Sequence, residues 1–309
     1  MRTHPPTLLT LARRAIETEG LFDLAGATGT GTRSRGCVLA AVSGGPDSIA
    51  LLHVLALLQK KLGFTLVAHG VDHGLRAEAG AELDLAAGLA ARLGVPFDRT
   101  RVTVADGGNL QARARAVRYE ALRDAAARAG AHVIATAHHA DDRAETFLLR
   151  LLRGSGPAGL AVLPARARGE DLVRPLLRAR RSDIEAHLMR HGLEVATDPS
   201  NRDPRFARVQ VRTRLLPLLT ELSPRIVEHL CALADQLGAL PDDPLAGIPR
   251  RSREALLDLA RGRRPNAIVS LGGDLVARVD RTQVHVVTEP HATARAAQRG
   301  RRKKITDPM

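Results

Sequence analysis

The segment Ser43–Ser48, with the sequence Ser-Gly-Gly-Pro-Asp-Ser, constrains the fold of this chain more than any other feature. It follows the apolar run Cys37–Val42, which is typical of a buried strand. It precedes Ile49–Leu62, where apolar residues recur every three or four positions as on one face of a helix. Pro46 suits a first helical turn because its missing N–H would be unpaired there. The segment therefore predicts a strand, a tight turn and the start of a helix.

A glycine turn that opens a helix is a natural anion site. Two adjacent glycines let the backbone approach a ligand, and the N–H groups and dipole of the helix N-terminus favour phosphate or pyrophosphate. Asp47 is the unusual member, because a carboxylate beside a phosphate repels it unless a divalent cation lies between them, which predicts Mg²⁺. The turn lacks the lysine of a Walker loop and the third glycine of a dinucleotide fingerprint. An ordinary glycine turn is the alternative, which the flanking strand and helix disfavour.

Strands and helices alternate beyond this turn. Apolar runs predict further strands at 64–69, 97–104 and 132–137, and amphipathic stretches predict helices at 77–93 and 109–128. This rhythm predicts an α/β fold with a doubly wound, mainly parallel sheet, whose ligands bind at the carboxyl ends of the strands. A helical extension and a small C-terminal α+β domain should follow.

Later segments define the expected boundaries. A strand-like patch covers 172–177, Ser182 is the expected N-cap of a helix that stops at Gly192, and Gly272-Gly273 indicates a hairpin between apolar runs 267–271 and 274–287. The expected parts are an N-terminal helix and connector at 1–35, an α/β domain at 36–217, a helical linker with a small basic domain at 218–288, and a basic, disordered tail at 289–309.

Polar side chains follow the strand expected at 132–137. His138 and His139 come first, and Asp142 and Glu145 are three residues apart, so they share one face near the start of a helix. Acidic residues in a first turn often only complement the helix dipole. Paired histidines and aspartates could instead ligate a metal, although the spacing matches no closed zinc site. These carboxylates suit Mg²⁺ or a substrate ammonium.

Arginine dominates the charge of the chain. Lysine and arginine total 46 against 33 acidic residues, a formal net charge of +13, and only four of the 46 are lysines. Arginine pairs with phosphates bidentately, so a nucleic-acid partner is favoured, while an arginine-rich proteome is the alternative explanation. After the turn Asp198–Asp203, the helix expected at 206–216 is rich in arginine and forms either a solvated face or a phosphate-binding one. The candidate nucleic-acid contacts are Arg202, Arg205, Arg208 and Arg212.

Cysteine usage and hydropathy point to the cytoplasm. Cys37 and Cys231 are far apart and form no Cys-x-x-Cys pair, as expected in a reducing compartment. The longest apolar run, Ile49–Leu58, is interrupted by a histidine and is too short to span a bilayer. Two glutamates in the first twenty residues speak against a signal peptide. We expect a cytoplasmic protein without membrane contact.

Six ordered motifs between residues 37 and 217 carry a family resemblance. They are Ser43–Ser48, Val71–Arg76, Asn109–Tyr119, Thr136–Leu149, Gly154–Gly156 and Asp198–Asn201. The set resembles the tRNA(Ile)-lysidine synthetases of the pyrophosphate-loop superfamily, whose fold is that of the N-type ATP pyrophosphatases and adenine nucleotide alpha hydrolases. The chain departs from the family pattern at Gln111, Arg143 and Val209, where glutamate, glutamine and asparagine are usual. The C-terminal part matches poorly, so the tRNA features it reads stay open.

The resemblance implies an ATP-dependent ligation at the wobble cytidine of tRNA(Ile) with a CAU anticodon. The C2 oxygen would attack the α-phosphorus of ATP and release pyrophosphate, and the ε-amine of L-lysine would then attack C2 and expel AMP. The product is lysidine, which changes codon reading from AUG to AUA. The implied cofactors are ATP and Mg²⁺, and the partners are this tRNA and L-lysine. The oligomeric state stays open, with a homodimer as one option.

The same resemblance implies roles for individual residues. Residues 36–217 would be the catalytic domain, in which Asp47 would hold Mg²⁺ while Asp142 and Glu145 would bind lysine and position or deprotonate its amine. Arg118 would steady phosphate charge or bind substrate, although on an amphipathic helix it could be a surface arginine. ATP would be bound by Ser43, Gly44, Gly45, Pro46, Asp47 and Ser48. Further nucleotide or substrate contacts would be Asp72, His73, Arg76, Arg115, His138 and His139.

Four rival functions are open. A tRNA thiolase shares the loop but needs cysteines to carry sulfur, and ammonia-using synthetases lack the context around Asp72–Arg76. A metal-dependent phosphohydrolase could use the His/Asp clusters at 69–73 and 138–142. A non-catalytic RNA-binding protein would not be expected to keep Asp47 together with Asp142 and Glu145.

Overall fold

The computed structural model describes most of the chain. The described residues are 6–23, 36–72, 74, 79–103, 110–167, 171–196, 206–240, 252, 254–256, 258, 261, 268–272, 275–280 and 283–288. Several residues singled out above lie outside this set: His73, Arg76, Arg202, Arg205, the turn at 198–201, the tail at 289–309 and the side chain of Gln111. The chain divides into two compact units, Met1–Leu240 and Pro241–Met309. The domain boundaries expected from the sequence stay predictions.

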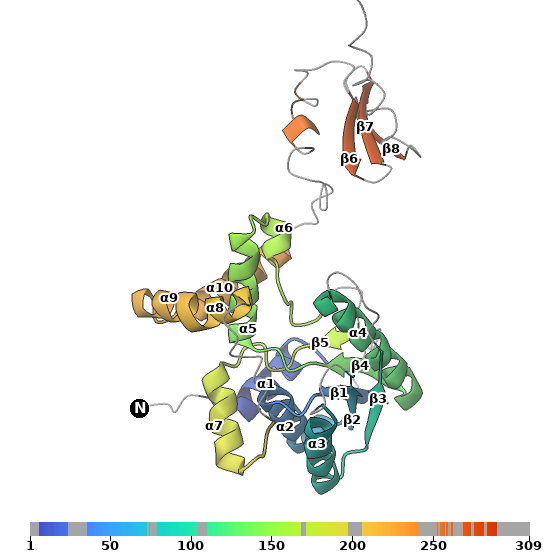
Figure 1. Ribbon diagram of the computed structural model, residues 1–309, viewed down its shortest axis with the longest axis vertical. Coiled ribbons are helices and arrows are strands. Elements are labelled where there is room, and N and C mark those ends of the chain that lie inside the picture. The colour runs from blue at the N-terminus through green and yellow to red at the C-terminus, as the bar shows by residue number, and fades with distance from the viewer. Residues whose placement is uncertain are drawn as a thin grey trace, which may run out of the picture. The chain divides into compact units, whose positions relative to one another are not determined.

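A five-stranded parallel sheet forms the centre of the first unit (Figure 1). Its strands are β1 (Cys37–Val42), β2 (Thr65–Asp72), β3 (Phe97–Arg101), β4 (Ala131–Ala135) and β5 (Leu172–Val173), in the order β3-β2-β1-β4-β5. Every neighbouring pair is parallel, which confirms the expected doubly wound α/β fold. The strand expected at 172–177 is only two residues long, because Pro175 has no N–H for the ladder.

Helices cover both faces of this sheet. In Figure 1, α4 lies on one side and α1, α2 and α7 lie on the other. The alternation of β1 explains this, since Val38, Ala40 and Val42 pack into the core with α2, whereas Leu39 packs with Tyr119 on α4. The helices are α1 (Leu8–Thr18), α2 (Pro46–Leu62), α3 (Ala79–Leu93), α4 (Leu110–Ala129), α5 (Ala140–Leu152), α6 (Pro157–Leu160), α7 (Arg181–His191), α8 (Ala207–Gln210), α9 (Leu216–Leu222) and α10 (Ile226–Ala239).

The expected helical extension is built on α5. Phe147 and Leu148 of α5 pack with Val227 and Leu230 of α10 in a core of their own. The helix expected at 206–216 is not a single α-helix, because Val211–Leu215 forms a π-helix between α8 and α9. Pro217 lies in the first turn of α9, and a proline cannot donate the helical hydrogen bond to the carbonyl four residues earlier.

Helix α7 starts before the expected N-cap. Ser182 lies inside the helix, and the backbone N–H of Arg180 donates to the carboxylate of Asp183 at 2.8 Å. The helix ends at Gly192 as expected, with φ of 57°. This earlier start brings two adjacent arginines to the helix N-terminus.

The second unit contains a small antiparallel sheet. Its strands are β6 (Ile268–Gly272), β7 (Leu275–Asp280) and β8 (Gln283–Thr288), in that order. Strands β6 and β7 pair antiparallel on either side of the hairpin expected at Gly272-Gly273, and the apolar run 274–287 spans both β7 and β8, which also pair antiparallel. Buried Leu256 and Ala277 form its described core. Across the described part of the whole chain, no helix has both the length and the apolar character that crossing a bilayer requires.

Candidate active site

The expected anion loop lies where the direction of the sheet reverses. β1 pairs with β2 on one side and with β4 on the other, and both pairs are parallel. The loops after β1 and β4 therefore meet at the carboxyl edge of the sheet, where α2 and α5 start. In doubly wound folds this is the usual position of a ligand.

The loop after β1 is closed by Ser48. The backbone N–H of Ser43 donates to the Ser48 hydroxyl oxygen at 3.1 Å, and that hydroxyl donates to the carbonyl of Gly45 at 2.9 Å. Gly45 is the N-cap of α2 and has no side chain to bond the first N–H groups, while Pro46 occupies the first turn as expected. The helix N-terminus is thus left facing the loop, in the arrangement that binds phosphate.

The two glycines of the loop are in different situations. Gly44 has φ of 81°, and a Cβ there would overlap the backbone of Glu82 on α3. Gly45 has an ordinary φ of −73°, and a Cβ there would meet only the Ser43 hydroxyl, at 3.8 Å. Gly44 therefore sets the path of the loop, whereas Gly45 keeps open the space in front of the helix.

Asp47 from the loop meets two residues that follow β4. One ligand atom each of Asp47, His139 and Asp142 lies within 4.8 Å of the others. The Asp47 carboxylate is 3.7 Å from His139 Nε2, which is 3.4 Å from the Asp142 carboxylate. Asp47 Oδ1 is buried without a hydrogen-bond partner. Burial raises the pKa of Asp47, and the neighbouring His139 offsets part of that shift.

The two adjacent histidines have opposite protonation behaviour. Burial would lower the pKa of His139, but Asp141, Asp142 and Asp47 outweigh it and raise that pKa. Burial lowers the pKa of His138 to about 3, with arginines nearby adding to the shift, and its Nδ1 is 3.0 Å from the hydroxyl of Thr136. His139 is therefore a candidate cation among carboxylates, and His138 is neutral.

Two arginines of the extension bond the carboxylates of α5. Arg212 Nε donates to Glu145 at 2.6 Å, and Arg208 donates to Glu145 at 2.8 Å and to Asp142 at 3.0 Å. Glu145 is fully buried. Burial would raise the pKa of Asp142, but His139 and Arg208 outweigh it and lower that pKa, so this carboxylate stays ionised. The side chain of Arg208 remains 45% exposed.

The α4 residues line a separate hollow. Arg115 and Arg118 lie over the ring of Tyr119, at 4.9 and 5.3 Å from its centroid. Arg115 and Tyr119 belong to a pocket of about 760 Å³ between α4 and residues 161–164. Its charged lining is Arg115, Glu120, Arg123, Arg150 and Arg174, and Ser43–Ser48 do not line it. Of the arginines that line this hollow, Arg115 and Arg174 lower the pKa of His138, and Arg118 of α4 does so too.

Known proteins share this architecture. The family described as the PP-loop domain matches residues 23–219, which is more than half of the chain. A tRNA(Ile)-lysidine synthase from a Methylobacterium species is 40% identical over 88% of this chain and 77% of its own length. The chain belongs to the tRNA(Ile)-lysidine synthase family of PP-loop proteins. Residues 23–219 are thus its PP-loop domain.

Other members of the lysidine synthase family are longer than the part they share with this chain. The relative from Novosphingobium aromaticivorans is 46% identical over 57% of this chain and 55% of its own length. The relative from Symbiobacterium thermophilum is 43% identical over 65% of this chain and 43% of its own length. The chain spans about half the length of these curated relatives.

A solved structure shares the fold. The U34-tRNA thiolase NcsA from Methanococcus maripaludis matches 75% of this chain and 80% of its own, with a TM-score of 0.61 and 16% identity. At this identity the likeness extends to the fold alone.

Two departures from the lysidine synthase pattern have structural explanations. Arg143 is 2% exposed, lies 2.7 Å from Asp235 of α10 and donates to the carbonyl of Val162 at 2.9 Å, so it joins α5 to α10. Val209 is buried in α8.

Asp72, a contact expected from the sequence, lies at the end of β2, where its carboxylate accepts the N–H of Gly74 at 2.8 Å.

Sequence reasoning gave no individual role to three residues beside the site of this family member. Asp141 accepts the backbone N–H of Arg181 at 2.8 Å and pairs with the Arg180 guanidinium at 3.2 Å, which ties α5 to α7. The Arg181 guanidinium is 3.9 Å from Glu145. Burial would raise the pKa of Asp141, but His139 and both arginines hold it far below its usual range. No local pattern marks Arg181, because its partners lie about 40 residues earlier in the chain.

Proposed function

We propose that this chain ligates L-lysine to C2 of the wobble cytidine of tRNA(Ile) with a CAU anticodon, using ATP and releasing AMP and pyrophosphate. One observation carries the proposal: the loop residue Asp47 and the α5 residue Asp142 approach within 4.8 Å at one sheet edge. A loop that binds the phosphates of ATP and a carboxylate that binds the amine of lysine would thus act on the same cytidine. Membership of the lysidine synthase family supports the same reaction.

The first step would activate the cytidine. Its C2 oxygen is a poor leaving group, so it would attack the α-phosphorus of ATP, break the bond to pyrophosphate and become an adenylate. The free N–H groups at the start of α2 would bind the phosphates, with Gly45 leaving space for them. Asp47 fits a Mg²⁺ ion, because its Oδ1 is buried without a hydrogen-bond partner. When bound, Mg²⁺ would offset the charge of the departing pyrophosphate.

The second step would transfer lysine. Its ε-amine has an ordinary pKa of about 10.4, so it must lose a proton before it can attack C2 and expel AMP. Asp142 is the more available carboxylate, since Glu145 is fully buried and already bonded to Arg208 and Arg212. We assign the amine contact and proton removal to Asp142, and to Glu145 the positioning of both arginines and a second carboxylate charge.

The tRNA would approach basic surfaces beside this edge. Arg208 uses part of its guanidinium for carboxylates, yet its side chain is 45% exposed, so it can also meet a phosphate. The charges of Arg115 and Arg118 lower the pKa of His138, and these arginines would steady nucleotide or phosphate charge. Arg212, more buried, would act mainly through Glu145. Contacts from Arg202, Arg205, Asp72, His73 and Arg76, and a cytoplasmic location, stay predictions from the sequence.

Two rival chemistries have less support. A thiolase needs a reactive cysteine, but burial raises the pKa of Cys231 to about 11, and the only other cysteine, Cys37, lies on β1. A two-metal hydrolase would need His69 beside the site. His69 is buried and lies 2.9 Å from the Thr100 hydroxyl and 3.9 Å from Asp98. His69 and Asp98 do not belong to the cluster of Asp47, His139 and Asp142, here called the Asp47 cluster.

Product analysis with α-labelled ATP tests the proposal. With CAU tRNA(Ile) and Mg²⁺ but no lysine, we expect pyrophosphate release and label retained on the tRNA as an adenylate. Adding lysine should convert that label to AMP. Release of ADP, ATP splitting that needs a sulfur donor, or phosphoester hydrolysis with manganese and no ATP would contradict the proposal and identify a rival.

A further inference from the structure

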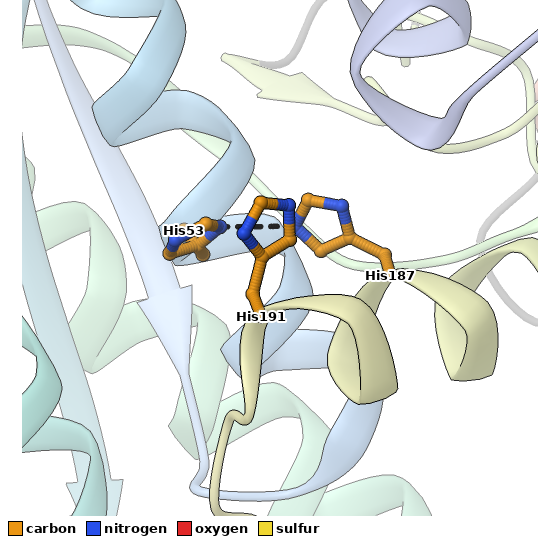
Figure 2. Close-up of side chains that lie close together, drawn as sticks. All are labelled: His53, His187 and His191. Carbon is orange, nitrogen blue, oxygen red and sulfur yellow. Dashed lines mark hydrogen bonds between the residues drawn. The ribbon is translucent and has the colours of Figure 1, made fainter.

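Three histidines converge away from the Asp47 cluster. His53 on α2 faces His187 and His191, which lie on successive turns of α7 (Figure 2). One ring nitrogen of each lies within 4.8 Å of the others. His53 Nδ1 and His187 Nε2 are 2.9 Å apart, and the His191 ring lies with its centroid 4.7 and 4.5 Å from those of the other two.

An ordinary core contact explains only part of this arrangement. His53 and His187 are buried and share one hydrogen bond, which would satisfy a pair of imidazoles. It does not require a third imidazole, and His191 is exposed, so packing does not explain why its ring turns to the pair. Spacing of four residues puts two histidines on one helix face, as in known metal-binding helices.

Two of the three rings, those of His53 and His187, are neutral at physiological pH. Burial lowers the pKa of His53, and the nearby His191 lowers it further. Burial together with His53, His191 and Arg190 lowers the pKa of His187 to about 4. Neutral imidazole is the form that ligates a metal, so no proton has to be removed from an imidazolium at these two rings.

We propose that His53, His187 and His191 bind a divalent transition-metal ion of the zinc class, with solvent as the fourth ligand on the exposed His191 side. Tetrahedral zinc with Zn–N bonds of about 2.0–2.1 Å sets its ligand nitrogens about 3.3 Å apart. The three nitrogens already lie within 4.8 Å of one another and would have to close to this spacing, while the 2.9 Å contact would have to open by a few tenths of an ångström. Imidazole ligands select zinc-class ions over Mg²⁺ or Ca²⁺.

Such an ion would hold together two helices, α2 and α7, that border the candidate active site. Helix α2 begins at the PP-loop, and the first turn of α7 holds Asp141 of α5. A metal that joins α2 to α7 would fix these two helices against each other. Because it binds the folded chain, it would also raise thermal stability.

Zinc binding by the full chain without a histidine tag tests the proposal. Calorimetry with Zn²⁺ alone, on protein carrying Asp47→Asn to remove the other cluster, should detect one ion and a rise in Tm. His191→Ala should weaken Zn²⁺ binding at least about tenfold and reduce the Tm rise, since one of three protein ligands is lost. His191 is exposed, so the variant should fold. His191→Cys, which supplies a thiolate ligand, should restore binding.

A matched control is His229→Ala, which removes an exposed histidine of α10 and should leave Zn²⁺ binding unchanged. If the Asp47→Asn protein binds Zn²⁺ with the same affinity and the same Tm rise whether or not it also carries His191→Ala, the proposal is overturned. A parent protein that takes up no ion at micromolar Zn²⁺ would overturn it too. Neither readout uses catalysis, so the result is independent of the proposed ligation.

Discussion

At the scale of single residues, the two glycines of the loop after β1 have different roles: Gly44 sets the path of the loop, and Gly45 leaves space for a ligand. Gly44 has φ of 81° and lies against the backbone of Glu82, so any side chain is excluded there. Gly45 has an ordinary φ and faces open space. The sequence predicts both as ligand-approach glycines, but only the packing of α3 on the loop distinguishes them.

Exchanging each glycine for alanine should separate these two roles. Gly44→Ala should lower Tm and weaken ATP binding, because a strained left-handed residue costs about 1–3 kcal/mol and the loop must move off Glu82. Gly45→Ala should leave Tm nearly unchanged yet weaken ATP binding, because its methyl group enters the phosphate space. Thermal melts and ATP titrations measure both. A Gly44→Ala protein as stable as the parent would contradict this account.

Asp47→Ala should abolish pyrophosphate release without unfolding the protein. Burial raises the pKa of Asp47 and leaves its Oδ1 without a hydrogen bond, so its removal should keep Tm unchanged or raise it. Asp124→Asn, an exposed carboxylate on α4, is the control and should retain activity. Full pyrophosphate release by folded Asp47→Ala protein would refute the assigned role.

At the scale of elements, α5 organises the site because successive residues pair with different partners. Asp141 binds the start of α7, Arg143 joins α10, and Glu145 holds Arg212 of the π-helix. The first two turns of one helix thus fix three other elements. Another face of α5 carries Phe147 and Leu148, which pack into the core shared with α10.

Arg143→Gln should destabilise the chain although it creates the residue more usual in the family. The shorter neutral side chain would lose the ion pair to Asp235 and the bond to Val162, which costs roughly 2 kcal/mol or several degrees in Tm. Asp235 keeps Arg178 at 2.6 Å, which limits the loss. The exposed Arg153→Gln is the control for thermal melts. Equal Tm values for the two variants would contradict this role.

Asp142→Asn and Glu145→Gln should differ in what they damage. Asp142→Asn should impair lysine transfer more than tRNA adenylation, as measured by labelled lysine and labelled AMP in single turnovers. Glu145→Gln should instead lower Tm strongly, because it leaves two arginines beside a buried neutral group. If Asp142→Asn impairs both chemical steps equally, lysine does not bind there.

The elements were more predictable than the pairings between them. Hydrophobic periodicity and the loop identified β1, α2 and β4, and parallel strands then bring Asp47 and Asp142 to one edge. The bonds of Arg208 and Arg212 to Glu145 were not predictable, because they join residues 63 and 67 positions apart. The run of arginines in the sequence left a solvated face and a phosphate-binding face open, and packing of the π-helix on α5 turns these two side chains to the carboxylates.

At the scale of the whole molecule, the excess of arginine predicts salt-sensitive binding of tRNA. With a formal net charge of +13, the chain should release counterions from the tRNA, so log affinity should fall linearly with log salt at a slope of about −0.7 to −0.9 per phosphate contacted. Arg115→Ala should make this slope shallower by about one contact. Filter binding across a NaCl series measures both. An affinity independent of salt would show that the arginine excess does not serve tRNA binding.

The measurement that tests the account most directly is lysine incorporation. Purified protein would be incubated with radiolabelled L-lysine, ATP, Mg²⁺ and unmodified tRNA(Ile) with a CAU anticodon. We predict acid-stable label in the tRNA that requires ATP and is lost when the wobble cytidine is replaced by uridine. Folded protein that incorporates no lysine, or labels both tRNAs equally, would contradict the central claim.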